Sequence, residues 1–202
     1  MATTRRMGTE TSETRFRLLD ITERVMIEDG YAAVSSRRVA KDAGVTPALV
    51  HYYFATIDDL FLEVLRRRGR QQLERHERFL GSGQPLRALW SFSSQQAGTA
   101  LLMEFMALAN HRKTIRKELA EFADEFRRIE LRALSSHLEA YGLASDDVPP
   151  EAVLVGIAAL SRTVVMEEAL GMSVGLGETR ALVERVLDRC EGPAATDDRR
   201  SS

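Results

Sequence analysis

The chain has 202 residues, of which 44% are hydrophobic and 29% charged, and its formal net charge is −2. This composition is ordinary for a soluble globular protein, and the overall charge alone does not indicate a nucleic-acid partner. There is no run of about 18 or more apolar residues and no apolar stretch after the N-terminal arginines, so we expect neither a membrane span nor a secretory signal. The single cysteine, Cys190, excludes an intrachain disulfide and fits a reducing cytoplasm.

Charge is distributed unevenly along the chain. Residues 1–70 hold 12 Lys and Arg against 10 Asp and Glu, a net charge of +2, and the remaining residues carry a net charge of −4. A mildly basic N-terminal part followed by an acidic body fits a protein whose N-terminal part approaches phosphate groups. The difference is small, and it serves only as support for the motif described below.

Helical periodicity runs along almost the whole chain, and strand-like alternation is absent. A first helix is expected over residues 11–29, ended by Gly30 and preceded by a flexible arm. Ser35 or Ser36 offers an N-cap for a second, short helix that ends at Ala43.

The next segment has the spacing of a helix-turn-helix. Gly44 supplies the turn, Thr46 caps the following helix, and Pro47 takes its first position, where the missing N–H costs nothing. The residues whose spacing is typical of the motif are Ala40, Gly44, Val45, Val50 and Phe54. Such a motif presents its second helix to the major groove of DNA.

Further helices are expected through the rest of the chain. The fourth begins at Thr56, where Thr56 and Asp59 form a capping-box arrangement, and continues to Leu80. At ~1.5 Å per residue, about 24 residues give a rod of roughly 36 Å, long enough to link a head to a body. The later predicted segments are two short helices over 85–109 broken near 95–98, a striped helix over 115–133, a very apolar helix over 150–171 and an amphipathic helix over 177–190.

The first 65 or so residues resemble the TetR (tetracycline-repressor) family of bacterial transcription regulators. The resemblance is carried, in order, by RLLDIT, GYAAVS, VAKDAGVT, LVHYYF and FATIDDL. It implies an all-α fold with a three-helix DNA-binding head and flexible arm over 1–55, followed by a larger helical effector-binding and dimerisation body over 56–192. The composition of the tail over 193–202 predicts that it is disordered. The single cysteine fits a cytoplasmic protein, and no cofactor is expected.

The helix-turn-helix geometry predicts which residues meet DNA. Pro47, Ala48 and Leu49 begin the recognition helix and face the bases, where apolar side chains can only contact thymine methyl groups and the shape of the groove. The resemblance places Arg37 at a guanine edge and Tyr52 at a phosphate. The complete expected set is Ser35, Ser36, Arg37, Lys41, Thr46, Pro47, Ala48, Leu49, His51 and Tyr52. The hydroxyls of Ser36 and Thr46 have an alternative role as helix caps.

Two residues depart from the family pattern. Ile57 stands where the family usually has a lysine before the fourth helix, and His51 replaces the usual tyrosine of the recognition helix. One phosphate anchor is therefore missing. Lys41, or Arg5 and Arg6 on the arm, is expected to compensate, and a lower affinity for DNA is the alternative.

A head of this size reads only a few base pairs, so we expect a homodimer on a near-palindromic site in double-stranded DNA. The helix over 150–171 is more apolar than one buried face requires, and with the helix over 177–190 it predicts a four-helix bundle across a two-fold axis. The expected interface residues are Val153, Leu154, Ile157, Leu160, Val164, Leu182 and Val186. The alternative is an ordinary internal core helix.

The resemblance further implies a pocket for a small-molecule effector inside the body. Its expected lining is Trp90, Met103, Phe105, Met106, Phe122 and Phe126. Aromatic and methionine side chains at helical spacing belong to an ordinary core more often than to a pocket. This lining favours an apolar or amphipathic effector.

Catalysis is not expected, and neither is a metal site. No zinc-binding H-E-x-x-H or glycine-rich phosphate loop occurs, and the four histidines are scattered at positions 51, 76, 111 and 137. A helical oligomeric scaffold with a degenerate head is the main alternative, motivated by Ile57 and His51. Within the preferred class, repression is simpler than activation, because a bound dimer occludes a promoter.

Overall fold

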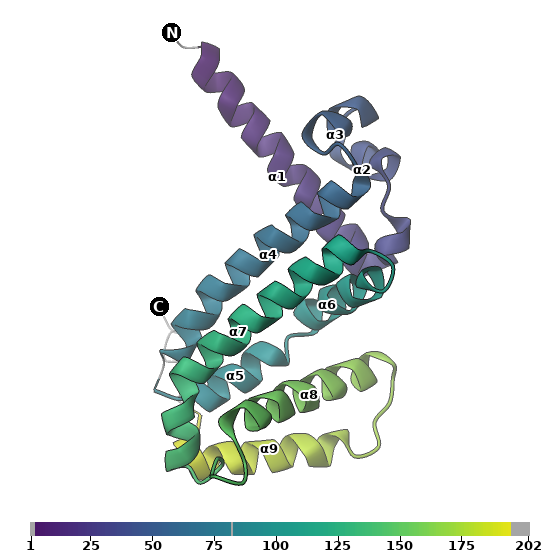
Figure 1. Cartoon of the computed structure of the whole chain (residues 1–202). Helices are drawn as coiled ribbons and strands as arrows, with labels where there is room; N and C mark the ends of the chain where they lie inside the picture. The colour runs from purple at the N-terminus through teal and green to yellow at the C-terminus, as the bar shows by residue number, and fades with distance from the viewer. Residues whose placement is uncertain (1–2, 82, 195–202) are drawn as a thin grey trace, which may run out of the picture. The chain divides into compact units, whose positions relative to one another are not determined.

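The computed structural model describes residues 3–81 and 83–194, and this part of the chain is helical with connecting turns (Figure 1). The prediction of an all-α fold is confirmed. The elements in chain order are α1 (Thr3–Asp29), the short 3-10 helix η1 (Tyr31–Ala33), α2 (Ser36–Ala43), α3 (Pro47–Tyr53), α4 (Ile57–Leu80), α5 (Pro85–Ser93), α6 (Gln96–Ala109), α7 (Lys113–Ala140), α8 (Pro150–Ala169) and α9 (Leu176–Glu191).

The helix boundaries differ most from the prediction at the N-terminus. α1 begins at Thr3 instead of residue 11, so the main chain of Arg5 and Arg6 is helical and does not belong to an extended arm. The break between α5 and α6 falls at Ser94 and Gln95, at the start of the predicted interval. Of the expected tail, residues 195–202 lie outside the described residues.

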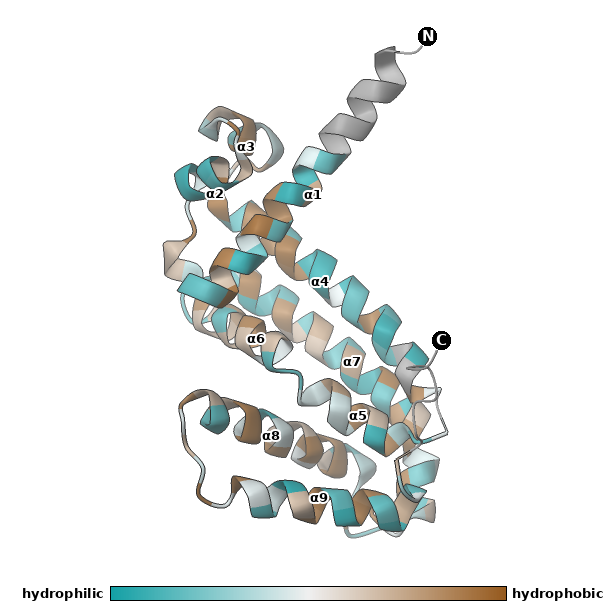
Figure 2. Cartoon of the chain, turned by 180° about the vertical axis from the view of Figure 1, so that it is seen from behind, coloured by the Kyte–Doolittle hydropathy of each residue, from teal (hydrophilic) through white to brown (hydrophobic). Residues whose placement is uncertain are grey.

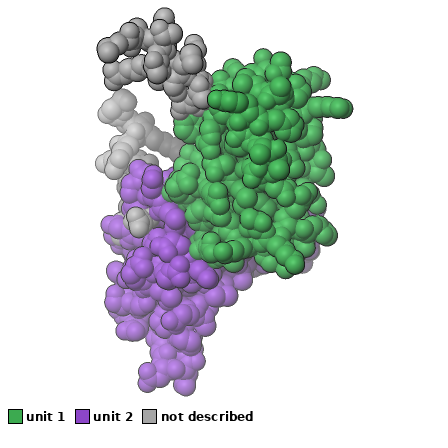
Figure 3. Space-filling model, turned by 45° about the horizontal axis from the view of Figure 1, so that its top comes forward, with its two compact units in different colours: residues 1–71, 100–122 green, residues 72–99, 123–202 purple. Residues whose placement is uncertain are grey.

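The chain divides into two compact units, coloured separately in Figure 3. Unit 1 comprises residues 1–71 and 100–122, and unit 2 comprises residues 72–99 and 123–202. The divisions fall inside α4, α6 and α7, so each of these helices contributes to both units. The predicted head of residues 1–55 therefore lies wholly within unit 1, which also contains body residues. The functional division at residue 55 stays a prediction.

Unit 1 is organised around one apolar core. Leu18, Val25 and Met26 of α1 are fully buried in it together with side chains from α2, α3 and the first part of α4. The later segment of the unit adds Phe105 from α6 and Ile115 from α7. Burial of this many large apolar side chains is the main contribution to the stability of the unit, since each contributes about 1.5–3 kcal/mol before entropy is counted.

Unit 2 has its own apolar core. Leu86, Leu89 and Trp90 of α5 pack there with residues of α7, α8 and α9, among them Leu138 and Leu154. α8 and α9 run side by side, and α8 is hydrophobic over much of its length (Figures 1 and 2). Five of its large apolar side chains are nevertheless not buried in the single chain: Val153, Val155, Ile157, Leu160 and Met166.

Candidate nucleic-acid interface

The helix-turn-helix of α2 and α3 is held together by local capping interactions. The Ser35 side chain caps α2 by accepting a hydrogen bond from the Arg38 N–H at 3.2 Å. The Thr46 side chain caps α3 in the same way, accepting from the Leu49 N–H at 3.4 Å, and Pro47 follows in the first helical position. Of the two predicted caps for α2, Ser35 is therefore the one used.

The turn between α2 and α3 depends on Gly44. Its backbone is left-handed, with φ 65° and ψ 33°, a conformation that a residue with a Cβ adopts only with strain. The Val45 N–H then donates to the Ala40 carbonyl at 2.9 Å and closes the end of α2. Ala40, Val50 and Phe54 are buried beneath the turn, so the two helices are fixed against α1 and α4 by the core of unit 1.

The structure places most of the predicted DNA contacts on the surface of α2, α3 and their caps. Ser35, Arg37, Lys41, Thr46, Pro47, Ala48, His51 and Tyr52 are exposed, and Ser36 and Leu49 are half-buried. The Tyr52 side chain is 75% exposed, an unusual degree for a large aromatic residue. Its ring lies edge-on against Tyr53, which packs against the core. Exposure makes these residues accessible to DNA, and their role in binding stays a prediction.

Arg37 and Arg38 have different surroundings. Arg38 donates to Asp42 and to Asp29, both at 3.0 Å, and hydrogen bonding to Asp42 raises the pKa of its guanidinium. Arg24 of α1 lies 3.5 Å from the same Asp42 carboxylate, which ties α2 to α1. Within the described part of the chain Arg37 and Lys41 have no ion-pair partner, so their charges are available to an external anion.

The start of α4 forms the predicted capping box, with aspartate in the place where glutamate is usual. The Asp59 carboxylate accepts from the Thr56 N–H at 2.9 Å, and the Thr56 hydroxyl accepts from the Asp59 N–H at 3.1 Å. Ile57 is half-buried and packs against the core of unit 1. The residue that replaces the family's lysine therefore contributes to packing.

Long-range polar contacts brace the head within unit 1, and sequence reasoning did not find them. The Glu104 carboxylate of α6 accepts a hydrogen bond from the Tyr31 N–H at 2.7 Å, just before α2. Arg66 of α4 donates two hydrogen bonds of 2.9 Å to Glu118 of α7. These bonds raise the pKa of Arg66 and lower that of Glu118. A separation of 52 residues leaves no local signal for such a pair.

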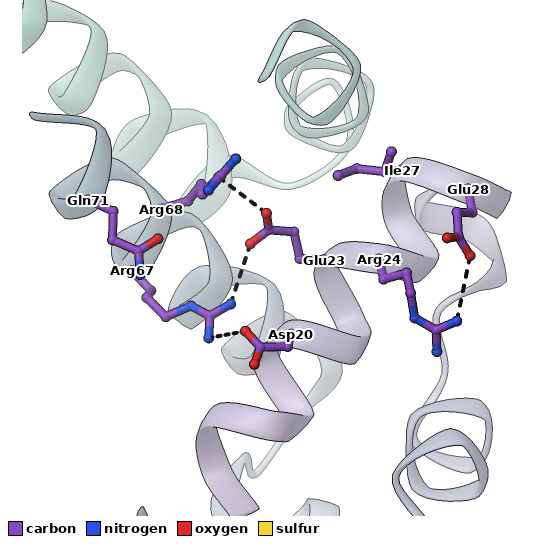
Figure 4. A pocket seen from close by; sticks show the side chains of 8 residues that line it. All are labelled: Asp20, Glu23, Arg24, Ile27, Glu28, Arg67, Arg68 and Gln71. Carbon is purple, nitrogen blue, oxygen red and sulfur yellow. Dashed lines mark hydrogen bonds and ion pairs between the residues drawn. The ribbon is translucent and has the colours of Figure 1, made fainter. Parts of the chain in front are cut away.

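A charged cleft of about 340 Å³ lies between α1 and α4 in unit 1 (Figure 4). Arg67 contacts Asp20 at 2.7 Å and Glu23 at 3.4 Å, and Arg68 contacts Glu23 at 3.2 Å. The whole lining is Asp20, Glu23, Arg24, Ile27, Glu28, Arg67, Arg68 and Gln71, with three acidic and three basic residues. Because these charges balance and pair with one another, the cleft serves to fasten α1 to α4.

The predicted effector-pocket residues do not form one cluster within either unit. Phe105 is buried in the core of unit 1, and Phe122 of the same unit packs over Gly69. Met103 is half-buried, whereas Met106 is 48% exposed and lines no interior. In unit 2, Trp90 is part of the apolar core and Phe126 contacts the His76 ring. Trp90 and Phe105 are therefore core residues, which was the alternative to a place in the effector pocket.

Sequence reasoning missed a buried polar pair in unit 2. The His76 side chain is 1% exposed, and its Nε2 lies 3.1 Å from Oε1 of Glu130. Phe92 and Phe126 contact the imidazole, with ring centroids 4.5 and 5.5 Å away. The sequence shows only that His76 and Glu130 fall on the inner faces of two amphipathic helices. This pattern does not identify the two residues as partners.

Two residues of the predicted dimer interface are corrected by the structure. Leu154 is fully buried in the core of unit 2, and Val164 is 2% exposed within the single chain, so neither can meet a second copy without repacking. Helical periodicity explains the error, because α8 has two apolar faces and the sequence does not show which is inward. Leu160 and Leu182 are 39% and 54% exposed, and Val153, Ile157 and Val186 are half-buried.

In the part of the chain that the structure describes, no helix is both long and apolar enough to cross a membrane. No three His, Cys, Asp or Glu side chains there are grouped so that they could hold a metal ion.

Comparison with known sequences connects the head to one family. Residues 18–64, from α1 to the first part of α4, match the family described as bacterial regulatory proteins, tetR family. The resemblance stated from the sequence is therefore confirmed for this segment. The proteins of this family are non-enzymatic DNA-binding regulators, in agreement with the expectation that the chain is not an enzyme. A comparison with curated protein sequences gives no match.

Solved structures share the fold over most of the chain. A TetR transcription regulator from Haloarcula marismortui is 21% identical, with a TM-score of 0.69 over 88% of this chain and 97% of its own. A protein from Saccharomonospora viridis in complex with choline is 18% identical, with a TM-score of 0.75 over 88% and 96%. A transcriptional regulator from Rhodococcus sp. is 24% identical, with a TM-score of 0.61 over 90% and 99%. The family match and this fold together support DNA-binding transcription regulation.

Proposed function

We propose that the chain is a ligand-responsive transcription regulator that binds a near-palindromic operator as a homodimer and represses transcription until a small effector releases it. The observation that carries the proposal is the helix-turn-helix within the matched segment, whose recognition helix α3 has an exposed N-terminal end. Arg37 and Lys41 add two exposed cations on the adjacent helix, neither of which has an ion-pair partner among the residues that the structure describes. This arrangement presents both a base-reading surface and phosphate-binding charges.

The chemistry of the head defines the kind of DNA contact. Pro47, Ala48 and Leu49 offer apolar contact to thymine methyl groups, and Arg37 can form paired hydrogen bonds with guanine O6 and N7. Phosphates would be met by Lys41 of α2 and by His51 and Tyr52 of α3. Sequence selectivity would therefore depend on one strong hydrogen-bonding residue together with shape and methyl contacts.

Dimer formation is supported by the apolar side chains that α8 and α9 leave uncovered in the single chain. Val155, Leu160 and Leu182 are 50%, 39% and 54% exposed. Monomeric soluble proteins rarely expose large contiguous apolar patches, and such patches mark sites of association. A two-fold pairing of these helices would place two heads on the half-sites of a palindrome, spaced about 34–36 Å or a multiple of it.

Release by a ligand requires two conformations with different affinity for the operator. An effector can shift the equilibrium only through its own difference in affinity for the two states, and the coupling is reciprocal. α4 contributes to both compact units, so a change in unit 2 can reach the head through this helix. The complex of the Saccharomonospora viridis protein with choline supports a small-molecule site in this fold, and we expect an apolar or amphipathic effector here.

The test is selection of bound fragments from host genomic DNA by the full chain at about 0.15 M salt. We expect enrichment of a near-palindrome, and loss of that enrichment in the double variant Arg37→Ala and Lys41→Ala, whose side chains are exposed and unpaired. Repression predicts that the enriched site overlaps a promoter and that transcription from it rises when the protein is absent. Failure to enrich any sequence, with the chain folded, would favour the alternative of a helical scaffold with a degenerate head.

A further inference from the structure

The His76 ring of unit 2 is buried, yet only one of its two nitrogens has a partner. Nε2 lies 3.1 Å from Glu130 Oε1, while Nδ1 is inaccessible to solvent and has no hydrogen-bond partner among the described residues. Buried polar atoms are almost always hydrogen-bonded, because an unpaired one has lost its bond to water without replacement. The unpaired Nδ1 therefore marks a position where a further hydrogen-bonding group is required.

His76 is also the centre of an aromatic group. The Phe92 ring of α5 and the Phe126 ring of α7 lie 4.5 and 5.5 Å from the imidazole, and the two phenyl rings are 6.4 Å apart. Both phenylalanines are only half-buried, so part of each ring remains free for another apolar group. An aromatic ring packs well against such surfaces in edge-to-face or offset geometry.

Other unpaired polar atoms come from residues close in sequence to this aromatic group. Gln72 precedes His76 by four residues on α4 and so lies on the same helix face. The buried side-chain atoms without a partner in this region are Gln72 Oε1, His76 Nδ1, Ser94 Oγ and Arg127 Nη1. They come from α4, the end of α5 and α7, the same three segments that supply the aromatic group. Each of these buried atoms has lost its bond to water without gaining a protein partner, which is uncommon in folded proteins.

The charges around His76 define what it can bind. Glu130 is 8% exposed, and its second oxygen lies 3.5 Å from the Arg127 guanidinium, so the carboxylate is already balanced by one cation. The imidazole can donate its Nε2–H to Glu130, and in the neutral ring with this tautomer Nδ1 carries a lone pair that accepts a hydrogen bond. Because the charges of Glu130 and Arg127 already offset each other, a ligand that adds no further buried charge is favoured.

We propose that unit 2 binds a neutral hydroxylated aromatic compound of the phenol class, whose O–H donates to His76 Nδ1 and whose ring packs against Phe92 and Phe126. This inference rests on the proposed function, since it names the class of effector that the regulator would respond to. The hydroxyl oxygen keeps its acceptor lone pairs while its O–H is donated to Nδ1, so a phenol can take a further hydrogen bond at the same group.

The first measurement is calorimetric titration of the full chain with 4-ethylphenol and with its methyl ether, 4-ethylanisole, which has the same ring but no donor. We expect the ether to bind about tenfold or more weakly, because it leaves Nδ1 unpaired. 4-Ethylbenzoate and phenyltrimethylammonium, an anion and a cation, should bind more weakly still. Equal binding of phenol and ether, or tighter binding of either ion, would overturn the inference.

The second measurement assigns the contact to His76. In the chain labelled with ¹⁵N-histidine, 4-ethylphenol should shift the Nδ1 resonance of His76, identified by its absence in His76→Phe. That variant should bind 4-ethylphenol about tenfold less tightly, whereas His137→Phe, at an exposed histidine of α7, should bind as the native chain does. Unchanged affinity in His76→Phe would contradict the inference. If that variant does not fold, the His76 resonance is assigned by elimination with variants of the exposed His51, His111 and His137, and the ligand comparison and the labelled native chain still decide.

The failure of this inference and of the proposed function can be told apart. An enriched operator that binds the chain, with no selective binding of 4-ethylphenol, overturns the phenol site and leaves the regulator standing. Selective phenol binding by a chain that enriches no DNA leaves the site and overturns the regulator. Selective phenol binding that does not change operator affinity overturns the effector role, because coupling between the two sites must then be zero.

Discussion

Arg37 and Arg38 are neighbours on α2, but their side chains have different roles. Arg38 is held by Asp29 and Asp42 and links α2 to the end of α1, whereas Arg37 is exposed and has no ion-pair partner among the described residues. A guanidinium that is already paired must lose those bonds before it can meet a base. Arg37 is therefore the better candidate for direct readout, and Arg38 provides a structural control.

Replacing Arg37 with alanine should cost about 1–3 kcal/mol of binding free energy at one base position of the operator and relax selectivity there. The reason is loss of a paired hydrogen bond to guanine, which no other exposed cation of α2 can replace in the same geometry. Titration of operator variants, each altered at one position, measures the effect. Uniform weakening across all sequences would instead identify Arg37 as a phosphate contact.

Lys41 should act through charge alone. Its ammonium is exposed at the C-terminal end of α2, and a phosphate contact there releases counterions from DNA irrespective of sequence. In Lys41→Ala we expect the slope of log K against log salt to become shallower by about 0.9. Selectivity among operator variants should stay unchanged. A changed base preference at constant slope would contradict this role.

At the scale of the helices, the contact between Gly69 of α4 and Phe122 of α7 determines how closely these two helices approach in unit 1. A Cβ built on Gly69 would lie 2.5 Å from Phe122 Cε1, far inside van der Waals contact. Alanine normally favours a helix over glycine by about 1 kcal/mol. At Gly69 the steric cost of the added Cβ outweighs this preference, because the Phe122 ring packs against the core and would have to move to make room.

Gly69→Ala should therefore destabilise the chain by about 1–3 kcal/mol, measured by urea unfolding. Gly177→Ala is the matched control, because its Cβ would meet nothing within 4 Å at the start of α9 and should have a small stabilising effect. Adding Phe122→Leu to Gly69→Ala should recover part of the loss. A Gly69→Ala chain that is more stable than the native one would show that the helices are free to separate.

The ion pair between Arg66 of α4 and Glu118 of α7 should make stability depend on pH. The hydrogen bonds from Arg66 hold the pKa of Glu118 below its value of about 4.3 in the unfolded chain. The stabilisation is therefore present above that pH and is lost as pH falls through the lower, folded pKa. Arg66 is 39% exposed, so solvent screening limits the contribution to about 1 kcal/mol or less.

Comparing urea unfolding of the native chain and Glu118→Gln across pH tests this pair. We expect the difference in unfolding free energy to be constant between about pH 5 and 7 and to shrink below about pH 4, where the native carboxylate is protonated. A difference that grows on acidification would show the opposite linkage. Arg128→Gln at an exposed position of α7 provides the control, since its pair with Glu125 is solvated.

The elements were predictable from sequence to the extent that their signals are local. Thr46 and Pro47 identify the start of α3, Gly44 the turn before it, and Thr56 with Asp59 the start of α4, because each acts on backbone groups within a few residues. The pairs that shape the interior were not predictable. Arg66 with Glu118 and His76 with Glu130 are more than 50 residues apart and meet only through tertiary packing.

For the whole molecule, operator binding and assembly are expected to depend on each other. One head buries too little surface on DNA for strong selectivity. In a dimer, binding of the first head holds the second at a high effective concentration near its half-site, which raises the affinity for the whole operator. Leu160 of α8 and Leu182 of α9 are among the predicted interface residues, and both are exposed in the single chain. If these leucines are covered in the dimer, a charge at either position would be buried without a partner.

Leu160→Glu and Leu182→Glu should each convert the dimer to a monomer in sedimentation equilibrium at micromolar concentration and weaken operator binding by about a hundredfold or more, the lower bound of the avidity gain. Val148→Glu is the matched control, because Val148 is 45% exposed but lies in the turn before α8. It should leave both assembly and DNA affinity unchanged. Leucine variants that remain dimeric and bind DNA normally would place the two-fold interface elsewhere on the chain. Monomeric variants that still bind the full operator tightly would show that operator binding does not depend on dimer formation.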